Sequence, residues 1–140
     1  MVRADLARLK IARAGARLEQ AEAMLAQPVD AFIADVPGRD LASFYLLLAI
    51  QEAMDLAAHW IADAGWSAPD DAGATFKLLA ERGAIDGALA DGMRAAAGLR
   101  NRIAHGYADL DHARLHAEFS AGVATVRRFL AAVARAAGLA

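Results

Sequence analysis

Hydrophobic and polar residues follow one another along this chain with the period of α-helices, and no segment shows the two-residue alternation of a strand. Apolar side chains recur three, four or seven positions apart, which places them on one face of a helix. Prolines, glycines and capping aspartates divide the pattern into five predicted helices, at about 3–27, 41–64, 74–82, 85–104 and 112–137. Long helices joined by short loops predict an all-α fold, an antiparallel helical bundle that forms one domain over residues 1–140.

The second predicted helix, 41–64, is apolar on nearly all sides, so we expect it to be the central and most buried element. Asp40 is predicted as its N-cap, and Gly65 as the residue that ends it. The segment before it, 28–39, contains Pro37-Gly38 and is predicted to be a loop or a short broken turn.

The first predicted helix is apolar on two sides. One side carries Val2, Leu6 and Leu9, and the opposite side carries Ile11, Leu18 and Leu25. A helix of this kind usually contacts two things, its own core and a second chain. This pattern therefore predicts an interface with another copy.

Composition narrows the class of protein. Hydrophobic residues make up 58% of the chain, but many are alanines, which favour closely packed helices rather than a membrane protein. The most apolar run, 41–50, is too short to span a bilayer, and charges near the N-terminus argue against a signal peptide, so we expect a cytoplasmic protein. The absence of cysteine excludes disulfides and thiolate chemistry. A formal net charge of −2 argues against a broad basic surface, but a local phosphate site remains possible.

The fourth predicted helix carries an unusual charge. Arg100 lies within its apolar stripe, where it must meet a carboxylate, a partner chain or an anionic ligand. His105 follows five residues later, which on a regular helix is about 140° around the axis. Gly106 is expected to end the helix and let His105 turn back toward Arg100, with Tyr107 at the turn.

An arginine and a histidine side by side suit RNA cleavage without a metal. A neutral imidazole at His105 can take the proton from the ribose 2′-hydroxyl, and the planar guanidinium of Arg100 can stabilise the charge that grows on the phosphate. Asn101 would orient His105 or hold a phosphate oxygen. The spacing alone is not specific, because a histidine at the end of a helix also interacts favourably with the helix dipole.

The segment Arg100-Asn101-Arg102-Ile103-Ala104-His105-Gly106-Tyr107 resembles the Arg-x4-6-His signature of HEPN domains, in the Arg-Asn-x-x-x-His-x-Tyr form of the HepT toxins. Residues 45–57 and 76–79 also resemble the second and third helices of that family. The likeness extends over about 41–130.

The resemblance implies a homodimer in which the two motifs face each other in one cleft. It implies a metal-independent endoribonuclease without a cofactor, with Arg100 and His105 catalytic and Asn101 as a polar helper. Such a protein is the toxin of a type II or type VII pair, and its antitoxin is a minimal nucleotidyltransferase that transfers AMP to Tyr107. The added phosphate would pair with Arg100 or Arg102 and compete with RNA.

Glu52, Asp55 and His59 share one side of the second predicted helix. They either orient Arg100 or His105, or form a structural ion pair that satisfies an arginine, and we favour the structural pair. His112 and His116 have the spacing of metal ligands on one helix face. No third ligand is apparent, so no metal site is expected.

Two other functions compete with the ribonuclease. One is a non-catalytic HEPN module that binds a nucleotidyltransferase partner or a nucleotide, and the other is an unrelated bundle that only dimerises. The intact pair of Arg100 and His105 favours the ribonuclease over the non-catalytic HEPN module. The motif, together with the likeness of the second helix, disfavours the unrelated bundle.

Overall fold

The computed structural model describes residues 3–139, which contain six α-helices and no strand. The helices are α1 (Ala4–Leu25), α2 (Val29–Ala34), α3 (Val36–Asp63), α4 (Ala72–Glu81), α5 (Gly87–Gly106) and α6 (His112–Ala136), with a 3₁₀ turn, η1 (Tyr107–Asp109), after α5. The all-α prediction is confirmed, and the five predicted helices correspond to α1, α3, α4, α5 and α6.

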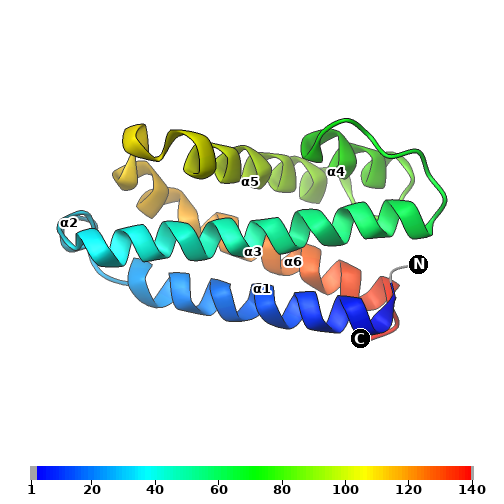
Figure 1. Cartoon of the computed structure of the whole chain (residues 1–140), viewed down its shortest axis with the longest axis horizontal. Helices are drawn as coiled ribbons and strands as arrows, with labels where there is room; N and C mark the ends of the chain where they lie inside the picture. Colours follow the sequence, from blue (N-terminus) through cyan, green and yellow to red (C-terminus); the bar gives the residue numbers. More distant parts are fainter. Residues whose placement is uncertain (1–2, 140) are drawn as a thin grey trace.

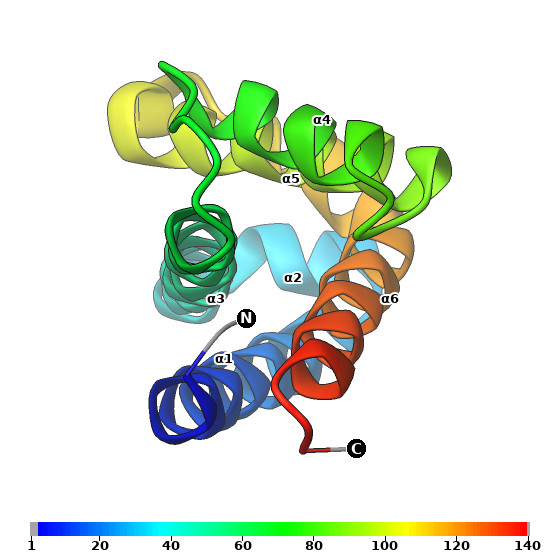
Figure 2. The ribbon, with the colours of Figure 1, turned by 90° about the vertical axis from the view of Figure 1, so that its right-hand side faces the viewer.

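The four long helices α1, α3, α5 and α6 form the antiparallel bundle (Figure 1). Viewed along the bundle, they surround its centre, and α4 lies over α5 (Figure 2). The short helix α2 packs against both α3 and α6. It lies at the same end of the bundle as the start of α3 and the last turn of α5 (Figure 1). We call this the motif end.

The helix ends follow the capping signals of the sequence. Asp71, Asp86 and Asp111 each accept a hydrogen bond from a backbone N–H in the first turn of the helix that follows. Gly65 and Gly83 take a φ of 75°, the left-handed conformation that commonly closes a helix. These caps explain why most helix boundaries could be predicted closely.

The prediction for residues 28–39 holds only in part. The short helix α2 agrees with a short broken turn, whereas residues 36–39 form the first turn of α3 instead of a loop. Asp35, not Asp40, caps α3, because its carboxylate accepts a hydrogen bond of 3.2 Å from the Gly38 N–H. Pro37 fits in the first turn, where its missing N–H costs nothing. Asp40 therefore lies within α3, and its carboxylate is available for another contact.

The core lies around α3, as predicted. Buried side chains of α3 face α1, α4, α5 and α6, and the bulky ring of Phe129 packs edge-on against Phe76 at 5.2 Å. By length and composition alone, α3 is apolar enough to cross a membrane. Its buried positions instead pack within the bundle, which is the behaviour of a central helix.

Some apolar side chains remain on the surface. On α1, Leu18 and Leu25 are buried, whereas Leu9 on the other side is 48% exposed; Val2 lies outside the described residues. On α3, Leu41 and Phe44 are 43% and 52% exposed, near the motif end. Leu6, on the same side as Leu9, is half-buried, so the described part of α1 leaves only Leu9 of that side well exposed, and α3 adds a second apolar area.

Candidate active site

The motif predicted from the sequence occupies the last two turns of α5 and the turn η1. Helix α5 ends at Gly106, as expected, but His105 stays within the last turn of the helix, so the expectation that it turns back toward Arg100 is wrong. Arg100 and His105 therefore keep their helical register and diverge by about 140° around the axis.

Arg100 is half-buried, and its charge has no acidic partner among residues 3–139. Its Nη1 donates to the Asn101 side-chain oxygen at 3.2 Å, a contact within the motif. Its Nε is buried and has no hydrogen-bond partner in the described part of the chain. An unsatisfied donor on a charged group is costly, so this guanidinium suits an anion or a second chain that completes it.

His105 is exposed, one residue before the end of α5. Ile103, two residues earlier, is buried and fixes this turn of the helix against the core. The imidazole is thus presented to solvent by a rigid helix rather than by a loop. It can meet a substrate hydroxyl without any rearrangement of the backbone.

Tyr107 begins the turn η1 and is half-buried. Its hydroxyl donates a hydrogen bond to the Asp40 carboxylate on α3, and its ring meets the edge of His112 at 5.5 Å. Burial, followed by the hydrogen bond to Asp40, raises the pKa of the Tyr107 phenol. Sequence reasoning missed this contact because it assigned Asp40 as a helix cap. The signal in the sequence is Asp35 followed by Pro37, which is typical of a helix start. With Asp35 as the cap, Asp40 falls inside α3 and its carboxylate is free for another contact.

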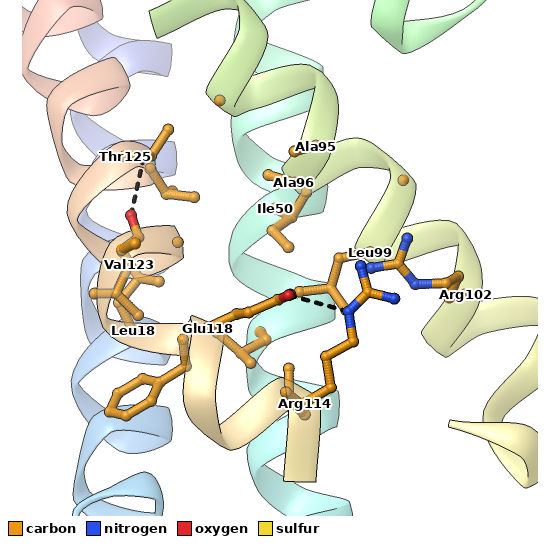
Figure 3. A pocket seen from close by; sticks show the side chains of 18 residues that line it. Leu18, Ile50, Ala95, Ala96, Leu99, Arg102, Arg114, Glu118, Val123 and Thr125 are labelled. Atoms are coloured by element: carbon orange, nitrogen blue, oxygen red, sulfur yellow. Dashed lines mark hydrogen bonds and ion pairs between the residues drawn. The ribbon is translucent and has the colours of Figure 1, made fainter. Parts of the chain in front are cut away.

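Arg102 lies on another side of α5, toward α6. It lines a cavity of about 490 Å³ between these helices, together with Arg114 and Glu118 (Figure 3). Arg114 pairs with Glu118 at 3.0 Å. The cavity is bounded at one side by a close approach of α5 to α6, where a Cβ on Gly92 would lie 2.6 Å from Thr125 Cγ2.

Glu52 and Asp55 face α1. Both pair with Lys10, at 3.0 and 3.5 Å, and Arg13 lies 3.9 Å from Glu52. The structural interpretation of these acids agrees with the geometry, although the main partner is a lysine rather than an arginine. Neither carboxylate contacts Arg100 or His105 within the chain, so the alternative that they orient the motif is not what the structure shows.

The two histidines with metal-ligand spacing have other contacts. His112 packs against Tyr107, and His116 Nε2 lies 2.7 Å from the Gln27 carbonyl oxygen. Over residues 3–139, no cluster of three or more histidine, cysteine or acidic side chains could hold a metal ion.

Comparisons with known proteins bear on this arrangement. A family model described as ribonuclease HepT-like matches residues 15–133. A solved structure of a tri-AMPylated Shewanella oneidensis HEPN toxin, in complex with MNT antitoxin, superposes with a TM-score of 0.86. It is 21% identical and covers 94% of this chain and 98% of its own. A toxin–antitoxin structure with AMP-PNP gives a TM-score of 0.82 at 21% identity, covering 92% of this chain and 98% of its own.

A curated relative covers less of the chain. A protein of Archaeoglobus fulgidus named "Putative RNase" is 41% identical over 69 residues, or 49% of this chain. The match spans 52% of that relative, about half of its length. The solved structures therefore establish the HEPN fold along nearly the whole chain, and the family model extends over the motif.

Proposed function

Because the chain belongs to the HepT-like ribonuclease family, we propose that it is a metal-independent endoribonuclease and the toxin of a toxin–antitoxin pair. The observation that carries this proposal is the half-buried Arg100, without an acidic partner among residues 3–139, on the same helix end as the exposed His105. Both groups are accessible from solvent, so RNA could reach them, and we propose a cytoplasmic location for this activity.

The chemistry assigns one role to each residue. His105, in its neutral form, takes the proton from a ribose 2′-hydroxyl, whose oxygen then attacks the adjacent phosphorus. Arg100 stabilises the negative charge of the five-coordinate phosphorus with two parallel N–H donors. The 5′-oxygen leaves with a proton returned by an imidazolium, and a 2′,3′-cyclic phosphate remains. Asn101, which holds Arg100, would keep the guanidinium oriented.

The site needs two copies of the chain. Since Arg100 and His105 diverge on one helix, a two-fold axis near the motif would bring the arginine of one copy toward the histidine of the other. The exposed Leu41 and Phe44 on the neighbouring helix supply an apolar surface for such a homodimer. A monomer by light scattering at micromolar concentration would contradict this part of the proposal.

Tyr107 is the proposed point of control. A nucleotidyltransferase antitoxin would transfer AMP to its hydroxyl, adding a negative phosphodiester and a bulky nucleoside at the motif end. The phosphodiester would pair with Arg100 and compete with RNA. Arg102, the other partner considered, lies on the cavity side of α5 and is the less suited of the two. The tri-AMPylated relative, bound to its MNT antitoxin, supports this reading.

The ribonuclease is tested by cleavage of RNA in excess chelator. We expect 2′,3′-cyclic phosphate ends, and loss of nearly all activity in His105→Ala and in Arg100→Lys, because a lysine lacks the planar fork. Arg135→Lys is the matched control, since this exposed arginine lies in the last turn of α6, at the opposite end of the bundle (Figure 1). Activity that survives His105→Ala, or that requires a divalent metal, would refute the mechanism.

The switch is tested separately by co-expression with the partner nucleotidyltransferase. The peptide that contains Tyr107 should gain one or more AMP masses, and Tyr107→Phe should carry none and should escape silencing. Mass on another residue, or full silencing of the Phe variant by the partner's catalysis, would show that the switch lies elsewhere.

A further inference from the structure

The Tyr107 hydroxyl lies in a group of polar side chains that the ribonuclease chemistry does not use. It donates to the carboxylate of Asp40, which is about half exposed at the motif end of α3. The Arg39 Nε lies 3.8 Å from the same carboxylate oxygen, and Arg39 is held in turn by a hydrogen bond of 3.1 Å to the Ile33 carbonyl. The nearby Ser43 is buried, with no hydrogen-bond partner for its hydroxyl in the described chain.

This arrangement has the form of an activated nucleophile. A hydroxyl is hydrogen-bonded to a base, and a positive charge lies beside that base. Helix α3 supplies both the base and the arginine, and η1 supplies the hydroxyl, so the phenol and the guanidinium of two distant segments meet at one carboxylate oxygen of Asp40.

We propose that Asp40 is the general base for AMP transfer to Tyr107, an inference that rests on the proposed function. In this step the phenolic oxygen attacks the α-phosphorus of ATP, which is held by the nucleotidyltransferase. The bond from oxygen to phosphorus forms, the bond from the α-phosphorus to the bridging oxygen breaks, and pyrophosphate leaves. The phenolic proton passes to the Asp40 carboxylate and then to water. The toxin thus contributes its own base to its inactivation.

The phenol needs such a base. An unperturbed tyrosine has a pKa of about 10, and burial, followed by the hydrogen bond to Asp40, raises the pKa of Tyr107 further, so little phenolate exists at neutral pH. Arg39 acts in the opposite direction, because its positive charge favours the phenolate. Removal of the proton during attack avoids the need for a free phenolate, and a positioned base typically contributes about 10²–10⁴ in rate.

The test measures the initial rate of AMP addition to purified, unmodified toxin by its partner nucleotidyltransferase with ATP, from about pH 6 to 9. Asp40→Asn keeps an oxygen that accepts the tyrosine hydrogen bond but cannot take the proton. We expect its first addition to slow by about 10²–10⁴. Its rate should rise about tenfold per pH unit as phenolate forms, while the wild-type rate changes less. Asp109→Asn is the matched control, an exposed aspartate in the same turn as Tyr107.

Two further measurements separate a base from an anchor. Asp40→Ala should regain part of its rate when formate supplies a small carboxylate, which an anchoring role would not produce. Where a second AMP follows the first, it is attached away from Asp40, so only the first addition should slow. Weakened binding of the partner would slow every addition equally and would overturn the proposal.

The outcomes distinguish this inference from the function on which it rests. If wild-type toxin gains no AMP at Tyr107, the proposed switch fails. If the wild type is modified there and Asp40→Asn reacts at the same rate with the same pH profile, only the role of Asp40 fails, and the base belongs to the partner. Thermal melts of Asp40→Asn and Asp40→Ala identify any loss of folding. If Asp40→Asn is unfolded, rescue of Asp40→Ala by formate decides whether Asp40 acts as the base.

Discussion

The contact between Gly92 of α5 and Thr125 of α6 allows the sign of a stability change to be worked out from the structure. A Cβ on Gly92 would lie 2.6 Å from Thr125 Cγ2, whereas ordinary van der Waals contact begins at 3.4 Å. Thr125 cannot turn away at low cost, because it is 9% exposed and its hydroxyl donates to the Ala121 carbonyl at 2.9 Å. The substitution Gly92→Ala therefore forces the two helices apart.

Two effects of opposite sign set the magnitude. Overpacking of a core costs about 1–3 kcal/mol, whereas alanine in place of glycine within a helix stabilises by about 0.5–1 kcal/mol. We expect Gly92→Ala to lower the free energy of unfolding by up to about 2.5 kcal/mol, since the cost of overpacking exceeds the gain from alanine. Gly122 is the matched control, since it lines the same cavity from α6 and its added Cβ meets nothing within 4 Å. Gly122→Ala should stabilise by about 0.5–1 kcal/mol.

The assay is urea unfolding followed by circular dichroism, at one protomer concentration because association adds stability. Thr125→Ser provides the decisive comparison, since it removes Cγ2 and keeps the hydroxyl. The serine should be less harmful in the Gly92→Ala background than in the wild type, because it relieves the overlap there. If Gly92→Ala stabilises as much as Gly122→Ala, or if the serine has the same effect in both backgrounds, the reasoning from this contact is refuted.

Three further predictions concern the core and the charges. Phe129→Ala should destabilise by about 3–5 kcal/mol in the same urea assay, because Phe129 is fully buried between aromatic neighbours. Lys10→Met should cost about 1 kcal/mol, because the partly buried Glu52 loses its nearest partner while Arg13 and the exposure of Asp55 offset part of the loss. The hydrogen bond to Glu52 raises the pKa of Lys10 above its ordinary value of 10.5. The stability lost in Lys10→Met should therefore be constant below pH 10.5 and should vanish as the pH rises above the raised pKa. A loss of stability that does not change with pH would contradict the pairing. Burial, and then the charge of Arg39, lower the pKa of His112, so the unfolded chain binds its proton more readily as pH falls below 6.5. Melting temperature should therefore fall with acidification more in the wild type than in His112→Gln, and equal falls would exclude His112 as the cause.

Most of the fold could be predicted because periodicity and capping agree along the chain. The exception is α2, whose six residues are too few to show a helical period. The sequence predicts the start of α3 too late, because Pro37 reads as a helix breaker although proline is favoured in the first turn of a helix. In both places the local sequence is compatible with a helix and with a loop, and tertiary packing selects the helix.

The site was harder to predict than the fold. A charged residue in an apolar stripe identified Arg100, and that inference needs only local spacing. The contact from Tyr107 to Asp40 joins residues 67 positions apart, which no local pattern reveals. The acids Glu52 and Asp55 were placed on the correct helix, but their partner on α1 depends on how two helices are rotated against each other.

The helix that carries Arg100 and His105 has a consequence for how the proposed toxin activity depends on the amount of protein in a cell. The two groups are separated by about 7.5 Å along the axis and point in different directions. On the proposed dimer, no movement within one copy can assemble a complete site. At concentrations below the dissociation constant of the dimer, activity would then grow with the square of the protomer concentration. A small leak of expression would be nearly harmless, whereas a burst would be toxic.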